Sequence, residues 1–132
     1  MGAQSRAKSN FNRAVLRLEN FVATPNRVEL TKAAIIQAFE FTFESSWKAL
    51  QSHHADVGLR CTNPRQCISE AIRAGLIPLE KEGAWLQMMQ DRNLTSHVYS
   101  VSLSDIIVDR ISKEHLENFL ALNKELSIAP SI

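Results

Sequence analysis

Apolar residues recur at helical spacing along almost the whole chain, and this period limits the fold more than any other feature. Phe11, Val15, Leu18 and Val22, for example, are three or four residues apart, which places them on one face of a helix. The chain has no strand-like alternation of useful length, no Asn-Gly hairpin turn and no internal repeat. These features predict an all-α fold.

The segment from about residue 29 to residue 54 is predicted to be the central helix, because its apolar residues cover more than one stripe. Phe41 and Ile36 lie off its main apolar face. A helix that is apolar nearly all round lies at the centre of its domain or turns its second side to a partner, and we expect both here. The main apolar face consists of Leu30, Ala34, Ile35, Phe39, Phe43, Trp47 and Leu50.

Local signals predict the ends of the first helix and of a short third helix. The first helix begins near Asn10, and Pro25 ends it. The third helix has Asn63 as its N-cap and Pro64 at its first position, and Gly75 ends it. A loop precedes this short helix.

Two further helices are predicted in the C-terminal half. A fourth helix begins near residues 81–83 and loosens near His97, because the polar run 93–96 is a poor helix interior. The run Ser102-Leu-Ser-Asp105 matches a capping box, so the last helix follows it and ends before Pro130.

The predicted architecture is a single domain over residues 1–132, an antiparallel four-helix-type bundle with one additional short helix. The polar residues 1–10 and the last residues, 127–132, are predicted to be frayed. Apolar residues make up 45% of the chain and charged residues 22%, which excludes a wholly disordered chain.

The net charge is +1, so no global basic field points to nucleic acid. The distribution is uneven, because residues 1–66 hold nine basic and five acidic groups while residues 67–132 hold six and nine. The excess of four positive charges in the first half is either a solvated helix face or an edge that contacts a polyanion.

Cys61 and Cys67 are the only cysteines, and their spacing matches no zinc pattern. We therefore expect reduced thiols, no metal site and a cytoplasmic location. No secretory signal is visible at the N-terminus, and no apolar run is long enough to cross a membrane.

Three histidines and both tryptophans are interpreted as structural. His53 and His54 are adjacent, so on a helix they diverge by about 100° and form no metal pair. Both are predicted to be surface residues. His115 lies on the apolar face of the last helix and is predicted to be a packing residue. Trp47 and Trp85 are expected in the core rather than as platforms for base stacking.

The densest polar run is Asp91-Arg92-Asn93-Leu94-Thr95-Ser96-His97-Val98-Tyr99, which includes the only tyrosine. On a continuous helix the side chains of Arg92 and His97 would point about 140° apart. They converge only if the helix distorts or if a second copy of the chain completes the site. On composition alone, the run is a polar helix end with a histidine cap.

Glu40 and Glu44 share a face of the central helix because they are four residues apart. They lie among aromatic residues, where an unpaired carboxylate is costly. Either they pair with Lys48 or Arg92, or one of them supports catalysis or contacts a nucleotide.

The run from Arg92 to Tyr99 resembles the Arg-x4-His-x-Tyr motif of HEPN-domain proteins, the helical partners of minimal nucleotidyltransferases. Two further stretches resemble the nucleotidyltransferase substrate-binding proteins of this group. Phe39–Lys48 is similar to their central-helix signature, and Asn63–Ile77 is similar to their short third helix. The resemblance covers roughly residues 11–125.

The resemblance implies a homodimer with a small nucleotidyltransferase as its partner. In one picture the pair is a toxin–antitoxin system, in which the helical dimer is a metal-independent endoribonuclease that the partner neutralises. In the other picture the helical chain is a non-catalytic substrate-binding or regulatory subunit of a split nucleotidyltransferase. A scaffold role without either activity is a third alternative.

The residue types suit RNA cleavage through the 2′-hydroxyl, which needs a base and a cation. His97 can serve as the base near neutral pH, and Arg92 offers a bidentate fork to phosphate. Asn93 can orient one of them, and no cofactor is implied. In relatives with this motif, the tyrosine at the position of Tyr99 accepts AMP from the partner, so the resemblance implies AMPylation there.

Overall fold

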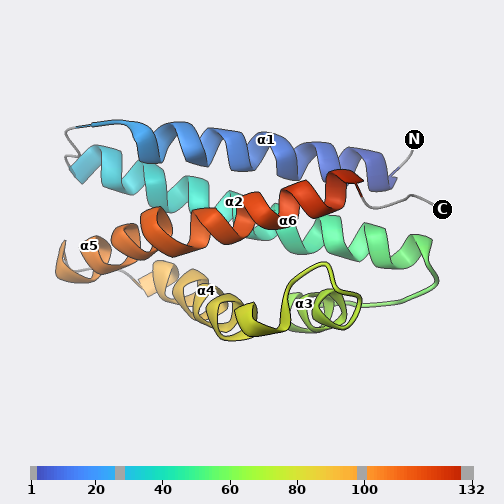
Figure 1. Cartoon of the computed structure of the whole chain (residues 1–132). Helices are drawn as coiled ribbons and strands as arrows, with labels where there is room; N and C mark the ends of the chain where they lie inside the picture. The colour runs from blue at the N-terminus through green and yellow to red at the C-terminus, as the bar shows by residue number, and fades with distance from the viewer. Residues whose placement is uncertain (1–2, 26–28, 98–100, 129–132) are drawn as a thin grey trace.

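The computed structural model describes residues 3–25, 29–97 and 101–128, and these form helices joined by short connections without any strand (Figure 1). The all-α prediction is therefore confirmed. The helices are α1 (Ala3–Ala23), α2 (Glu29–Asp56), α3 (Pro64–Arg73), α4 (Glu82–Leu94), α5 (Val101–Arg110) and α6 (Leu116–Ile128).

Helix α2 is the central element, as its apolar surface predicts, because it contacts α1, α3, α4 and α5. Helix α1 lies along α2, and α5 and α6 form one rod that crosses in front of α2 in Figure 1. Helices α3 and α4 lie on the side away from α1. The long helices α1, α2, α4 and α5–α6 alternate in direction along the chain, which gives an antiparallel bundle.

Aromatic side chains occupy the centre of the core. The ring of Phe119 on α6 makes edge contacts with Phe11 of α1 at 6.2 Å and with Trp85 of α4 at 5.9 Å between centroids. It also packs against Phe39 of α2 at 6.1 Å. Such pairs add directional contacts to the burial of large apolar surfaces, so these four rings fix the mutual placement of four helices. The prediction that Trp85 is a core residue is confirmed.

The ends of the short helix α3 follow the local signals. Asn63 Oδ1 accepts a hydrogen bond from the Gln66 backbone N–H at 2.9 Å, and Pro64 is the first helical residue. Gly75 follows the C-cap residue Ala74 with φ of +80°, a conformation that glycine adopts without a Cβ penalty.

Helix boundaries differ from prediction at both ends of the chain. Helix α1 begins at Ala3, seven residues before the predicted start at Asn10, and Ala7 packs against the core. Helix α6 continues to Ile128, so residues 127 and 128 are helical as well. Residues 1–2 and 129–132 lie outside the described part of the chain.

Helix α5 begins at Val101, so Ser102 is already inside the helix and the predicted capping box is wrong. The rod formed by α5 and α6 is interrupted by a π-helical turn over Ile111–His115. A π turn adds one residue to a helical turn, and here Ile111 and His115 are both buried. The apolar period alone does not reveal such an insertion.

Helix α2 ends at Asp56, close to the predicted end at His54, but three side chains differ from prediction. Leu30, which was placed on the apolar face, is 81% exposed. His53 and His54 are buried rather than on the surface. The chain folds back at the end of α2, so His54 Nε2 lies 3.0 Å from the Cys67 carbonyl oxygen of α3, while His53 lies near Lys8 of α1.

Cys61 and Cys67 form a disulfide, so the prediction of two reduced thiols is wrong. The bond ties the segment before α3 to the first turns of that helix, with both residues buried. The two cysteines are six positions apart in sequence, and the turn from the segment before α3 into that helix brings them together. Among the described residues, no helix has the length and apolar character that crossing a membrane requires.

Candidate functional site

Helix α4 ends at Leu94, and a 3-10 turn follows over Thr95–His97. The predicted loosening of this helix near His97 is therefore confirmed. A 3-10 turn advances about 120° per residue instead of about 100°, so Arg92 and His97 are not on one continuous α-helix. The turn does not by itself bring the two side chains together, because two steps of about 100° and three of about 120° leave them about 160° apart around the axis. Tyr99 lies outside the described residues.

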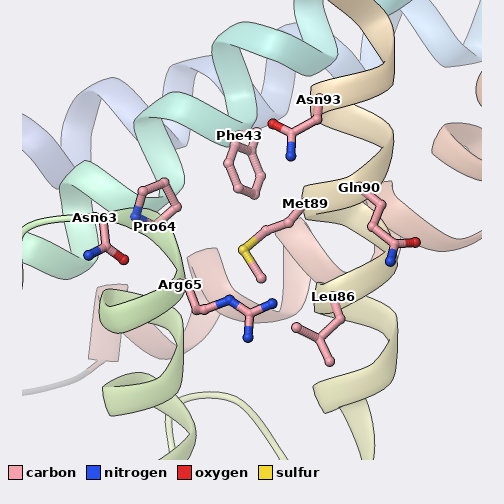
Figure 2. Close-up of a pocket in the computed structure, with 8 residues that line it drawn as sticks. All are labelled: Phe43, Asn63, Pro64, Arg65, Leu86, Met89, Gln90 and Asn93. Carbon is pink, nitrogen blue, oxygen red and sulfur yellow. The ribbon is translucent and has the colours of Figure 1, made fainter.

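Asn93 is exposed on the last turn of α4. It borders a cavity of about 380 Å³ between α3 and α4, with Phe43 of α2 at its inner side (Figure 2). Asn93 therefore lies beside open space, next to Arg92 in sequence.

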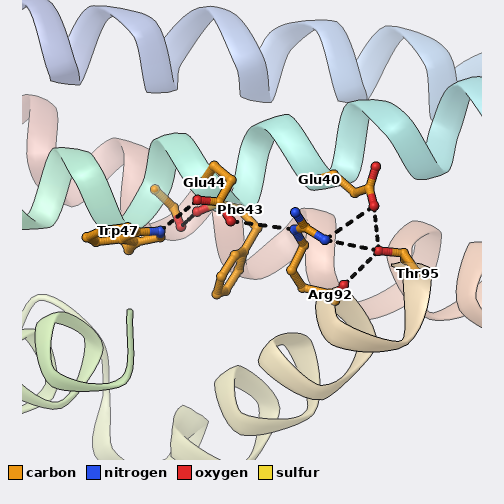
Figure 3. A network of polar contacts seen from close by, with 7 residues as sticks. Glu40, Phe43, Glu44, Trp47, Arg92 and Thr95 are labelled. Atoms are coloured by element: carbon orange, nitrogen blue, oxygen red, sulfur yellow. Dashed lines mark hydrogen bonds and ion pairs between the residues drawn. The ribbon is translucent and has the colours of Figure 1, made fainter. Parts of the chain in front are cut away.

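Arg92 is half-buried and turns toward α2, where it pairs with both candidate carboxylates (Figure 3). Arg92 Nη1 lies 3.3 Å from Glu40 Oε2, and Arg92 Nε lies 3.5 Å from Glu44 Oε1. The predicted pairing of the two glutamates with Arg92 is thus confirmed. Lys48, the other predicted partner, is exposed and is not among the residues that this network joins.

Two neutral side chains, those of Thr95 and Trp47, also donate hydrogen bonds to these carboxylates. Thr95 donates its hydroxyl to Glu40 Oε2 at 2.6 Å, and the Trp47 indole N–H donates to Glu44 Oε2 at 3.0 Å. Trp47 is half-buried, so its ring packs on the core while its nitrogen serves this network.

The guanidinium of Arg92 keeps an unused donor. Arg92 Nε is buried and makes no hydrogen bond in the described structure, because its 3.5 Å contact with Glu44 is long and poorly aligned. Leaving a buried donor without an acceptor costs free energy. A hydrogen bond from this N–H to an oxygen with better geometry than Glu44 Oε1 would therefore be favourable.

Asp91, which precedes Arg92 on α4, is a fully buried carboxylate that links α4 to the rod formed by α5 and α6. Asp91 Oδ1 accepts from Arg110 Nη1 of α5 at 2.9 Å and from Gln87 Nε2 at 3.0 Å. Asp91 Oδ2 accepts from His115 Nε2 of the π turn at 2.7 Å. Neighbouring residues thus fasten this turn to two elements, Asp91 to the α5–α6 rod and Arg92 to α2.

Sequence reasoning did not identify Asp91 as a structural residue. The available signal is its position, since Trp85, Met88 and Asp91 follow one another at three-residue intervals on the buried face of α4. The prediction that His115 is a packing residue is confirmed, because its ring also stacks on Phe39 with centroids 5.4 Å apart.

Burial lowers the pKa of His115, and this effect outweighs the hydrogen bond and the charge of Asp91, which raise it. Arg110 already balances the charge of Asp91 and lowers the pKa further, whereas Glu114 raises it. A second proton on His115 would sit on Nδ1, which is buried and has no hydrogen-bond partner in the described structure. Burial and the charge of Lys8 also lower the pKa of His53.

These shifts predict that the folded chain loses stability as the pH falls below about 6.5, the value in the unfolded chain. There the unfolded chain binds protons on His53 and His115 that the folded chain does not, so the free energy of unfolding falls with pH. The slope is at most about 1.4 kcal/mol per pH unit for each histidine. Urea unfolding between pH 7.5 and 5 measures it, and His115→Gln should reduce the slope. An unchanged slope would contradict the role of His115.

Among residues 3–25, 29–97 and 101–128, no group of three or more His, Cys, Asp or Glu side chains is arranged to hold a metal ion. The charged groups that surround α4 form ion pairs with one another instead.

Comparisons with known proteins agree with this arrangement of helices. The family described as "Nucleotidyltransferase substrate binding protein like" matches residues 7–128. The chain is similar to the crystal structure of ttk003001694 from Thermus thermophilus, with 30% identity and a TM-score of 0.75. That similarity covers 89% of this chain and 95% of the other. No curated protein matches the chain.

Proposed function

From the fact that the chain belongs to the nucleotidyltransferase substrate binding protein like family, we propose that it is the helical subunit of a two-component toxin–antitoxin system with a minimal nucleotidyltransferase. In this system the chain is a metal-independent endoribonuclease, and AMPylation by the partner neutralises it. The family description supports a nucleotidyltransferase partner.

The observation that carries the ribonuclease proposal is the state of Arg92. Its guanidinium is held in place by Glu40, yet the Nε donor has no hydrogen bond and only a long contact with Glu44. A phosphate oxygen that displaces this long contact with Glu44 gains a charge-assisted hydrogen bond from Arg92 Nε. Arg92 thereby stabilises the charge that grows on phosphorus.

The remaining roles follow from position and chemistry. His97, at the end of the 3-10 turn that follows α4, removes the proton from the 2′-hydroxyl. Asn93 orients His97 or the phosphate. Glu40 and Glu44 hold Arg92, and Lys48 adds a positive charge one turn beyond Glu44 on α2.

A homodimer is part of the proposal. Leu30 and Phe41 are 81% and 66% exposed although they belong to the central helix. They are eleven residues apart, so they lie within about 20° of each other around the helix axis. Two large apolar side chains exposed on one face suit an interface between two copies of the chain, and a two-fold interface would bring two motifs together.

The test is cleavage of a single-stranded RNA by the purified chain in EDTA. We expect a 2′,3′-cyclic phosphate on one product and a 5′-hydroxyl on the other, because the 2′-oxygen attacks phosphorus while the P–O5′ bond breaks and the leaving oxygen takes up a proton. The control is an RNA with a 2′-O-methyl group at the cleaved position, which should stay intact. Absence of cleavage by the wild-type chain, free of its partner, would contradict the ribonuclease proposal.

Tyr99 is the proposed acceptor of AMP. A phosphodiester charge and a bulky nucleoside beside the motif would compete with RNA for Arg92, so modification should stop cleavage. Incubation with the partner, ATP and Mg²⁺ should add one or more AMP masses to the chain. Tyr99→Phe should prevent this gain and keep RNA cleavage, because the phenol is the acceptor and not the base. AMP on another residue would contradict the assignment of Tyr99.

The second candidate is a substrate-binding or regulatory subunit without its own catalysis, which the words of the family description favour. It predicts that the chain alone leaves RNA intact and that it changes the activity of the nucleotidyltransferase when the two are mixed. The same EDTA experiment therefore separates the two candidates.

A further inference from the structure

The cavity between α3 and α4 has an apolar inner wall. The wall consists of Phe43 from α2 and of Leu86 and Met89 from α4, which are three residues apart and share a helix face (Figure 2). Phe43 is buried, Met89 is half-buried and Leu86 is exposed, so the wall runs from the core to the surface. A flat apolar ligand can lie against this wall and leave its edge in the solvent.

The rim of the cavity is polar and carries one cation. Arg65 on the first turn of α3 is exposed, and Figure 2 shows it reaching from α3 toward Met89 and Leu86. Within the described part of the chain no ion pair involving Arg65 is present, so its guanidinium can bind a phosphate.

The other polar groups of the rim are amides. Gln90 and Asn93 are three residues apart on α4, and both are exposed. An amide offers donors and an acceptor together, as the edge of a nucleobase requires. Asn63 uses its Oδ1 to cap α3, so its NH₂ group is left as a donor. The volume of about 380 Å³ falls in the range of small-molecule sites.

The cavity adjoins the network of Arg92. Asn93 borders the cavity and follows Arg92, and Phe43 lies between Glu40 and Glu44 on α2. Figure 3 shows the Phe43 ring beside Arg92. A polynucleotide held at Arg92 therefore has this cavity within reach of its next nucleotide.

We infer that the cavity is a binding subsite for one nucleotide of a single-stranded RNA, adjacent to the phosphate at Arg92. Its base lies against Met89 and Leu86, with Phe43 behind them, and its phosphate pairs with Arg65. The inference rests on the proposed function, and it adds the means by which the chain selects unstacked RNA. Base stacking on such a wall tolerates different bases, whereas the amides of Gln90 and Asn93 supply a preference.

The subsite is prepared before the ligand arrives. The disulfide between Cys61 and Cys67 and the cap by Asn63 hold the start of α3, which carries Arg65. Ordering these groups in advance lowers the entropic cost of binding.

Binding of a fluorescein-labelled RNA hexamer and of AMP to the His97→Ala chain tests the inference without cleavage. Arg65→Gln and Met89→Ala should each weaken hexamer binding about tenfold, the loss typical of one phosphate or stacking contact. Phe43 is avoided because it belongs to the core. The matched control is Arg73→Gln, an exposed arginine on α3 outside the cavity, which should bind like the parent chain.

The outcomes separate this inference from the proposed function. Hexamer binding that depends on Arg65, in a chain whose wild-type form does not cut RNA, supports the subsite and contradicts the ribonuclease. Cleavage by the wild-type chain together with unchanged binding by both variants overturns the subsite alone. Loss of AMP binding in Arg65→Gln with unchanged hexamer binding overturns the assignment to RNA and assigns the cavity to free nucleotides. In an active background, Arg65→Gln should raise KM and leave kcat nearly unchanged.

Discussion

Replacement of His97 or Arg92 with alanine is expected to reduce RNA cleavage by about 10²–10⁴-fold, the usual loss for a positioned acid–base group or charge-stabilising donor. Initial rates with a single-stranded RNA in EDTA measure the loss. Arg92→Lys keeps the charge but not the planar fork, so it should recover only a small part of the rate. Arg73→Ala, which removes an exposed arginine of α3, is the control and should keep full activity.

The two variants should differ in stability. Arg92→Ala leaves Glu40 and Glu44 facing each other without a cation, and because all three side chains are partly exposed the expected cost is only about 1 kcal/mol. Thermal unfolding followed by circular dichroism checks that both variants keep their helices. Full activity in both variants would contradict the catalytic roles, and unfolding of the variants would make the motif structural.

Asp91→Ala is expected to destabilise the chain more than any other loss of a polar side chain considered above. It removes the hydrogen-bond acceptor of Arg110 and of His115. Because His115 is only 1% exposed, its Nε2 would be left buried without a hydrogen-bond partner. Breaking a buried charge pair in this way typically costs about 3–5 kcal/mol. For a domain of this size the melting temperature should fall by roughly 10–20 °C.

Asp109→Ala is the matched control, because Asp109 pairs with Lys113 on the same rod but both side chains are exposed. We expect a change below about 0.5 kcal/mol there. Asp91→Asn keeps one acceptor and should lie between the two. Melting temperatures of Asp91→Ala and Asp109→Ala that agree within error would show that the buried network contributes nothing to stability.

Asp91→Ala should also weaken RNA binding, because Asp91 helps to fix the helical turn that carries Arg92. Asp91 and Arg92 are consecutive and fasten the same helical turn to different elements, so freeing one side loosens the position of the other. The KM for RNA should therefore rise even at temperatures at which the variant is folded.

The helices are predictable from the amino-acid sequence, because the signals that specify them are local. The apolar period placed α2 at the centre, and Asn63, Pro64 and Gly75 marked the ends of α3 through hydrogen bonds and backbone angles within a few residues. The end of α4 near His97 was predictable for the same reason, since a run of mostly polar residues interrupts the apolar period of this helix. The order of residues in the candidate motif was also available without any structure.

Which of these side chains contact one another depends on how the helices pack in three dimensions. Glu40 had two candidate partners, and its choice of Arg92 joins residues 52 positions apart. The burial of His54 and the contact of Asp91 with His115 likewise depend on how one helix lies against another. A helical period states which face is buried but not what covers it, because the cover comes from residues that are distant in the chain. The candidate site is made of such distant contacts, so its residue types were predictable while its charge balance and its cavity were not.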